Sequence, residues 1–114
     1  MKKHLAIIAL LACPSMVMAD NFAECLLDKL PGVQNDATAY AAAQLCTSKH
    51  PERYDSIAQG SGRGFFAYES GAECALDKGA DTQSNSAAGQ IRVACNRLYD
   101  KPKDLLDEFG LVPN

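Results

Sequence analysis

The stretch Ala23-Glu24-Cys25-Leu26-Leu27-Asp28-Lys29 recurs 49 residues later as Ala72-Glu73-Cys74-Ala75-Leu76-Asp77-Lys78. In each copy a second cysteine follows the first after 21 positions, and these second cysteines are Cys46 and Cys95. The chain therefore contains an internal duplication, with one cysteine near each end of the repeated unit. We expect the two repeats to have the same fold.

The repeats span about residues 21–51 and 70–102, and each begins like a helix. Asn21 and Ser70 are short polar residues that can accept a hydrogen bond from a free backbone amide, and a glutamate follows each of them three positions later. In the first repeat, apolar residues then recur at helical spacing, and Pro31-Gly32 ends the pattern. Gly79 is the expected end of the corresponding helix in the second repeat. The expected apolar positions of the first helix are Phe22, Cys25, Leu26 and Leu30.

A second helix is expected in each repeat, starting at Asn35-Asp36 and at Ser84-Asn85 and stopped by His50-Pro51 and Lys101-Pro102. Their expected buried faces are Ala39, Ala42, Ala43 and Cys46 in the first repeat, and Ala87, Ala88, Ile91, Ala94, Cys95 and Leu98 in the second. A short tail helix is expected over Asp104–Phe109. The predicted fold class is all-α: two disulfide-stapled helical hairpins that form a small four- to five-helix bundle.

The four cysteines of the repeats, Cys25, Cys46, Cys74 and Cys95, allow three disulfide connectivities. The duplication favours Cys25–Cys46 with Cys74–Cys95, because each unit then carries its own bridge, but the other two connectivities stay open. Closing a loop of this length stabilises a domain by roughly 3 kcal/mol in the chain-entropy model. We therefore expect these four cysteines to have a structural role, as disulfides that stabilise the fold.

The N-terminus is typical of a secretory signal peptide, with Lys2-Lys3, a short apolar run and Val17-Met18-Ala19. We expect residues 1–19 to be removed and residues 20–114 to form a single helical domain. The apolar run is shorter than the ~20 residues that span a bilayer, so no transmembrane segment is expected. The short, basic N-terminus suggests a bacterial protein that is soluble and either periplasmic or secreted.

A lipoprotein is the alternative form of export. Leu10-Leu11-Ala12-Cys13 resembles a lipidation motif, in which Cys13 would be kept as a membrane anchor. Cleavage after Ala19 is favoured, because it removes one of the five cysteines and leaves an even number.

The charge of the chain limits its partners. Lys2 and Lys3 fall in the expected signal peptide, which leaves nine of the 11 basic residues against 14 acidic ones, a net charge of −5. An acidic chain without a basic cluster is poorly suited to nucleic acid or anionic lipid, since both require neutralisation of phosphates. We expect a protein or peptide partner and no nucleic acid.

A segment rich in glycine and aromatic residues joins the repeats, reading Gly60-Ser61-Gly62-Arg63-Gly64 and then Phe65-Phe66-Ala67-Tyr68. The glycines predict a mobile or turn-rich linker, and the pattern of a phosphate-binding loop is missing. Arginine and aromatic residues are enriched at binding hot spots. The favoured interpretation is that Phe65 or Phe66 fills the core between the hairpins, although one ring can face inward while its neighbour faces out. The candidate partner-binding residues are Arg63, Phe65, Phe66 and Tyr68.

Few residues could carry chemistry. His50 is the one histidine beyond the expected signal peptide, and its place at a helix end suits the helix dipole better than catalysis. Bridged cysteines leave no reactive thiolate, and a single histidine cannot complete a zinc site. We expect no catalytic residue, cofactor or metal. The carboxylate pairs Glu24/Asp28 and Glu73/Asp77 lie one helical turn apart, which suits helix N-termini.

Several segments together carry a resemblance that covers nearly all of residues 22–99. They are Glu24–Asp36 leading to Cys46, Gly71–Cys74, Asp81-Thr82 and Ile91–Cys95 followed by Leu98-Tyr99. In these segments the chain resembles a group of small exported bacterial four-cysteine proteins of uncharacterised function, with a duplicated Cys-x20-Cys helical hairpin. The resemblance implies export, helical hairpins and disulfides, and it brings no catalytic residues to this chain.

These observations predict an exported, non-enzymatic module that binds a protein or peptide through the central loop and an exposed helix face. An inhibitor or an effector-immunity protein is a concrete form of this prediction. The alternatives are an envelope-stress or structural accessory protein and, less favoured, a small hydrolase that uses the carboxylate pairs.

Overall fold

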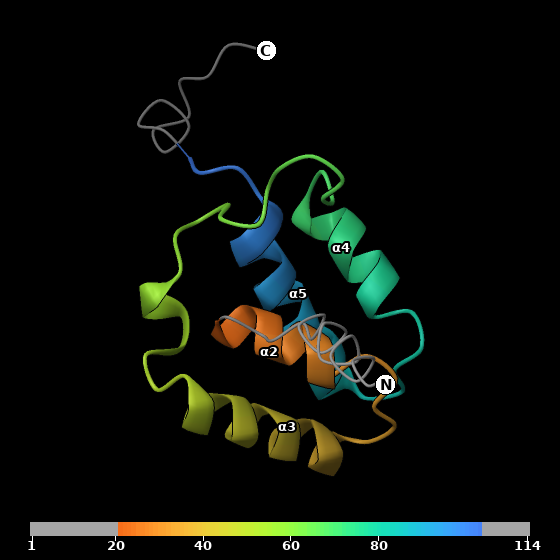
Figure 1. Cartoon of the computed structure of the whole chain (residues 1–114). Coiled ribbons are helices and arrows are strands. Elements are labelled where there is room, and N and C mark those ends of the chain that lie inside the picture. The colour runs from red at the N-terminus through yellow and green to blue at the C-terminus, as the bar shows by residue number, and fades with distance from the viewer. Residues whose placement is uncertain (1–20, 104–114) are drawn as a thin grey trace, which may run out of the picture.

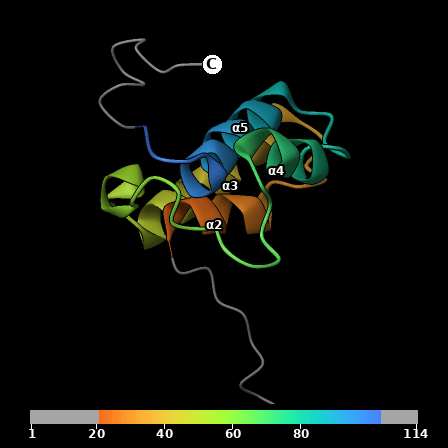
Figure 2. The same ribbon diagram turned by 90° about the horizontal axis from the view of Figure 1, so that it is seen from above.

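The computed structural model describes residues 21–103, and Figures 1 and 2 show them from two sides. These residues form α2 (Phe22–Lys29), α3 (Asp36–Lys49), the 3-10 helix η2 (Arg53–Ser56), α4 (Gly71–Lys78) and α5 (Asn85–Tyr99), with no strand among them. The predicted all-α fold of two helical hairpins is confirmed. The expected signal peptide, Cys13 and the tail helix over Asp104–Phe109 lie outside the described residues.

The helices begin where local capping predicts. The Asn21 side-chain oxygen accepts a hydrogen bond from the Glu24 amide at 2.9 Å. Asn35, Ser70 and Ser84 cap α3, α4 and α5 in the same way. Each cap gives a partner to one of the amides that a helix start leaves without one, which is why these boundaries can be seen in the sequence.

Each hairpin carries its own disulfide. Cys25–Cys46 joins α2 to α3, and Cys74–Cys95 joins α4 to α5, with Cα–Cα distances of 5.7 and 5.6 Å. All four cysteines are buried in the core. The connectivity that the duplication favours is therefore confirmed.

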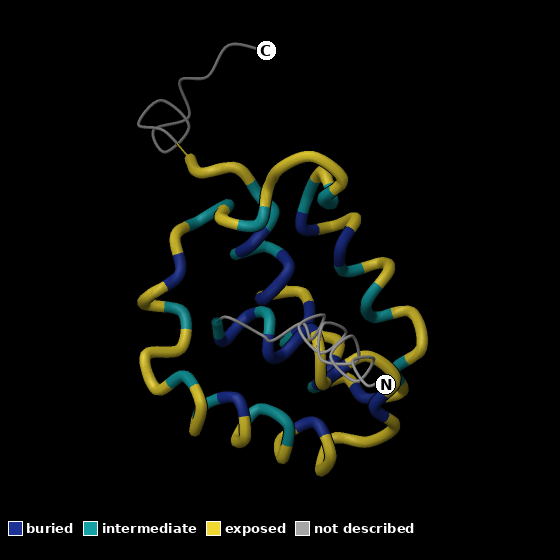
Figure 3. The backbone as a smooth tube through the Cα atoms, in the orientation of Figure 1, coloured by how far each residue is buried: buried dark blue, intermediate teal, exposed yellow. Residues whose placement is uncertain are grey.

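When the two hairpins pack together, the helix that lies at the centre has a different position in each repeat. Helix α5 packs against α2, α3 and α4, and α2 also contacts α3 and η2, so α2 and α5 form the centre (Figure 3). The inner helix is thus the first of the first repeat but the second of the second repeat. The largest fully buried side chains other than the cysteines are Phe22, Leu26, Leu30, Ile91 and Leu98.

The buried face of α5 differs from the predicted one at Ala88. Ala87, Ile91, Ala94, Cys95 and Leu98 are buried as predicted, whereas Ala88 is exposed. Consecutive helical residues differ in direction by about 100°. Ala88 is therefore rotated out of the face that Ala87 and Ile91 share.

The loops within the two hairpins lie side by side. The Val33 carbonyl accepts a hydrogen bond from the hydroxyl of Thr82, its equivalent in the second repeat. The Ser84 hydroxyl donates to Asp36 at 2.6 Å, and the Ser86 amide donates to the same carboxylate oxygen. These two hydrogen bonds lower the pKa of Asp36 below its usual 3.8. The repeats are thus joined by polar contacts as well as by the core.

The glycine-rich segment between η2 and α4 is turn-rich and bonded to the end of α5. The amides of Gly60 and Gly62 each donate to a carbonyl in the last turn of α5 at 2.8 Å. The Gln59 side chain donates to two further carbonyls there, at 2.7 and 3.0 Å. Because the last carbonyls of a helix have no partner within it, this segment acts as a C-terminal cap. It is a packed part of the domain, not a free linker.

Glycine is required at Gly60 and Gly62 by this packing. Gly60 has a φ of +80°, and a Cβ there would lie 3.0 Å from the Asp100 carbonyl oxygen. A Cβ at Gly62 would lie 2.8 Å from the Tyr99 ring. The backbone can approach the end of α5 this closely only without side chains.

The described helices do not combine the length and the hydropathy that a membrane span requires. Across residues 21–103, none of them is both long enough and apolar enough to cross a bilayer.

Candidate binding site

The central loop is the segment of residues 57–70 between η2 and α4. Its two phenylalanines, Phe65 and Phe66, point into solvent. Phe65 is 93% exposed and Phe66 is 104% exposed, and their ring centroids lie 5.7 Å apart. The favoured prediction that one of them fills the core is therefore wrong. The core is closed by α2 and α5, and the bonds between residues 59–63 and α5 leave the following residues on the surface.

Phe66 also has an unfavourable backbone conformation. Its φ is +67°, in the left-handed region that residues with a side chain rarely occupy. This conformation costs roughly 1–2 kcal/mol, and an exposed ring gains nothing from burial to offset the cost. Strained residues of this kind concentrate at functional sites. Phe66 thus combines two features that stability alone does not explain.

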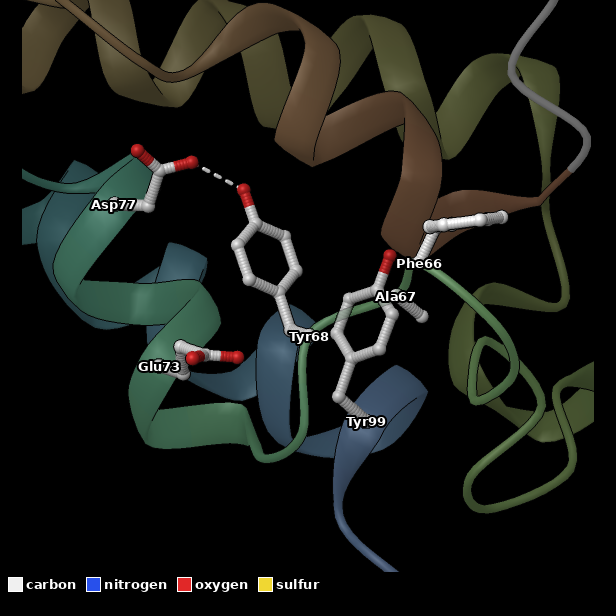
Figure 4. Close-up of a pocket in the computed structure, with 6 residues that line it drawn as sticks. All are labelled: Phe66, Ala67, Tyr68, Glu73, Asp77 and Tyr99. Carbon is white, nitrogen blue, oxygen red and sulfur yellow. Dashed lines mark hydrogen bonds between the residues drawn. The ribbon is translucent and has the colours of Figure 1, made fainter.

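A pocket of about 490 Å³ opens beside this loop (Figure 4). It is lined by Phe66, Ala67, Tyr68, Glu73, Asp77 and Tyr99. The Tyr68 and Tyr99 rings meet edge to face, with centroids 5.2 Å apart. In Figure 4 the Tyr68 hydroxyl points toward Asp77 on α4, while Phe66 points away from both carboxylates. The pocket therefore has aromatic rings on one side and acids on the other.

Helix α4 places the acids on one face. Glu73 and Asp77 are four residues apart, so their side chains lie one turn apart on the helix surface. A Glu73 oxygen accepts a hydrogen bond from the Glu69 amide at 2.7 Å, which ties the loop to the helix. Tyr68 donates to Asp77. Both carboxylates are thus held toward the loop that carries the aromatic residues.

The two tyrosines stay uncharged over a wide pH range. The hydrogen bond to Asp77 raises the pKa of Tyr68 to about 12, with smaller contributions from burial and from the Asp77 charge. Burial raises the pKa of Tyr99, and the negative charge of Glu24 raises it further. The charge of the pocket therefore comes from carboxylates alone. Aromatic rings beside carboxylates attract a cation.

Arg63 positions this loop. Its guanidinium donates to the Tyr99 carbonyl and, at 3.0 Å, to the Glu69 carbonyl. Arg63 thus ties residue 69, at the end of the loop, and its own position in the middle of the loop to the last residue of α5. Of the four candidate partner-binding residues, Phe66 and Tyr68 line the pocket, Phe65 lies against Phe66, and Arg63 holds the backbone. A role of Arg63 in partner binding stays a prediction.

Tyr99 was not identified from the sequence. It is the last residue of α5, and nothing in its neighbourhood links it to Tyr68. Only the docking of the central loop on the end of α5 brings the two rings together. A tyrosine at the predicted helix end was the one feature that could have suggested it.

The carboxylate pairs of the two repeats have different surroundings. Glu73 and Asp77 line the pocket, whereas Asp28, the equivalent of Asp77, is exposed with its oxygen 3.4 Å from the Lys29 ammonium. Glu24 lies close enough to affect Tyr99. Within residues 21–103 no three His, Cys, Asp or Glu residues gather into a metal site. The pocket on the second repeat is thus the site that the structure supports best.

The chain matches no protein-family model, no curated protein and no solved structure. The resemblance to exported four-cysteine proteins stays a prediction.

Proposed function

We propose that this protein is a non-enzymatic binding module that recognises a protein or peptide through Phe65, Phe66 and the adjoining pocket. The observation that carries the proposal is the full exposure of Phe66 in a strained backbone conformation. Leaving one large aromatic side chain in water forgoes about 1.5–3 kcal/mol of burial. Two adjacent ones form the kind of apolar anchor that dominates binding energies at interfaces.

The surroundings of the loop hold its two ends in place before any partner binds. Cys74–Cys95 links α4 to α5, and Arg63 and Glu73 bond to the loop backbone. A surface held in place before binding loses little conformational freedom when its partner arrives. This arrangement suits an inhibitor or an effector-immunity protein, the specific form that we favour.

The two disulfides support an oxidising compartment. Together with the expected signal peptide, they favour the periplasm or the extracellular space as the place where the partner is met. An effector delivered by a competing cell would be met in either place.

Capture of a partner tests this function. The mature, oxidised protein is immobilised and exposed to periplasmic extract and to competitor culture supernatant, and bound proteins are cross-linked and identified by mass spectrometry. We expect one partner at near-stoichiometric yield, lost when Phe65→Ala and Phe66→Ala are combined. Tyr40→Ala is the matched control, since Tyr40 is an exposed aromatic residue on α3, outside the loop.

Two results would overturn the proposal. One is the absence of any partner in both sources, which would favour the envelope-stress or structural accessory protein instead. The other is a partner that binds the double variant as well as it binds the unchanged protein. Circular dichroism of the double variant confirms that its helices are intact.

A further inference from the structure

The pocket lined by Tyr68, Tyr99 and the two α4 carboxylates has a composition that selects for one kind of side chain. We infer that it accepts an arginine of the protein partner, with the guanidinium against the tyrosine rings and its N–H groups on Glu73 and Asp77. This inference rests on the proposed function and specifies the chemistry of the partner.

The charged side chains that line the pocket are both carboxylates, and the nearby Arg63 guanidinium is engaged by the Tyr99 and Glu69 carbonyls. Glu73 and Asp77 line the pocket, the charge of Glu24 acts on its Tyr99 ring, and its lining contains no lysine or arginine. The chain that follows the expected signal peptide carries a net charge of −5. A negative surface steers a basic partner toward it and rejects an acidic one. The inferred partner therefore presents a basic surface.

The geometry favours arginine over lysine. Tyr68 and the Glu69 amide each engage one oxygen of a carboxylate, so Asp77 and Glu73 are fixed in direction and each has a second oxygen. A guanidinium is planar, stacks on aromatic rings and donates several hydrogen bonds at once. An ammonium is a compact point charge that makes no such planar contact. The volume of about 490 Å³ accommodates the larger group.

The chain itself contains a pairing of the same kind. The Arg53 guanidinium lies over the Phe22 ring, 5.1 Å from its centroid, beside a smaller pocket of about 190 Å³. Among residues 21–103, no cation of the chain lies over the Tyr68 or Tyr99 ring in this way. The smaller pocket thus already contains an arginine of the protein, Arg53, against its aromatic ring. The pocket of about 490 Å³ can take an arginine from a partner in the same way.

Titration with short peptides tests the inference. Isotope-labelled mature protein is titrated with acetyl-Gly-Arg-Gly-amide and followed by NMR at Tyr68, Glu73, Asp77 and Tyr99. We expect saturable shifts at these residues, with a dissociation constant on the order of 1 mM for so small a probe. The same peptide with citrulline, the uncharged isostere of arginine, should bind at least about tenfold more weakly. A lysine peptide should fall between the two.

Three exposed carboxylates, two in the pocket and one outside it, provide a test variant and its control. Glu73→Gln combined with Asp77→Asn should weaken binding of the arginine peptide at least about tenfold. Asp28→Asn changes the equivalent of Asp77 in the first repeat, outside the pocket, and should leave binding unchanged. The citrulline comparison uses the unchanged protein, so it decides the question even if the double variant folds poorly.

Equal binding of the arginine and citrulline peptides, or shifts that avoid the pocket, would overturn the inference. That result is separable from failure of the proposed function. If the captured partner depends on Phe65 and Phe66 while the peptides show no preference for charge, the binding module stands and the arginine pocket falls. If capture yields no partner, the proposed function itself falls.

Discussion

Leu27 and Leu76 occupy the same position in the two repeats, yet Leu27 is 7% exposed and Leu76 is 79% exposed. Leu27 lies on α2, which is packed by α3, α5 and η2, whereas Leu76 lies on α4, which packs against α5. Leu76 directly precedes Asp77 on α4, so the two side chains point about 100° apart, and Leu76 does not line the pocket. The duplicated sequence thus gives one core residue and one apolar surface residue.

Alanine at the two equivalent leucines should therefore have unequal effects. We expect Leu27→Ala to lower the free energy of unfolding by about 2–4 kcal/mol, because it leaves a cavity in the core. Leu76→Ala should change it by less than about 0.5 kcal/mol, because the side chain is already in water. Guanidinium denaturation of the oxidised proteins measures both. Similar losses for the two variants would contradict the described packing.

Two helix glycines should respond in opposite directions to alanine. A Cβ at Gly71 would lie 2.1 Å from the Asn96 side-chain oxygen and 2.7 Å from the Asn96 Cα, so α4 must move away from α5. We expect Gly71→Ala to destabilise by about 1–3 kcal/mol. A Cβ at Gly89 has nothing within 4 Å, and Gly89→Ala should stabilise α5 by about 0.5–1 kcal/mol. Thermal melts compare the two, and destabilisation by both would refute the prediction.

Glycine at Phe66 should stabilise the fold. Phe66→Gly removes a left-handed strain of roughly 1–2 kcal/mol and adds about 0.5–1 kcal/mol of unfolded-chain entropy. We therefore expect a net gain of up to about 1.5 kcal/mol, together with weaker partner binding. Phe65→Gly is the control, because Phe65 has no positive φ and should only lose stability. The midpoints of denaturant unfolding measure both effects. A lower midpoint for Phe66→Gly than for the unchanged protein would show that the backbone of Phe66 is not strained.

Removing the Asp77 carboxylate should change the titration of Tyr68. The pKa of Tyr68 is raised from 10.0 to about 12, and the hydrogen bond to Asp77 is the largest cause. Asp77→Ala should therefore bring this pKa down toward 10.0, so that Tyr68 ionises at lower pH. Ultraviolet absorbance or NMR titration follows the phenol. Asp28→Ala, at the equivalent position of the first repeat, should have no effect, and an unchanged Tyr68 titration in Asp77→Ala would contradict the assigned contact.

Local features of the chain predicted much of the fold. The caps at Asn21 and Ser70, the helix end at Gly79 and the duplicated cysteine spacing each depend on residues within a few positions or within one hairpin. Such features act on neighbouring backbone groups, so they can be recognised before any tertiary contact is known. The pairing of Cys25 with Cys46 belongs to the same class, because it stays within one repeat.

The candidate site was predicted only in part. Phe66, Tyr68, Glu73 and Asp77 were all singled out by the sequence, but as separate features of a loop and a helix. Tyr99 was missed, since its contact with Tyr68 depends on the bonds between residues 59–63 and the end of α5. Long-range docking of this kind leaves no periodic pattern in the sequence.

The sequence by itself determined the helices, their boundaries and, through the duplication, the preferred disulfides, because these follow from contacts between residues close along the chain. Only the tertiary structure decided which helix of each repeat is inside and which rings face solvent. Leu27 and Leu76 have almost identical neighbours in sequence, so local propensity cannot distinguish them. The difference arises because burial depends on how many helices surround a position, and that is a property of the assembled fold.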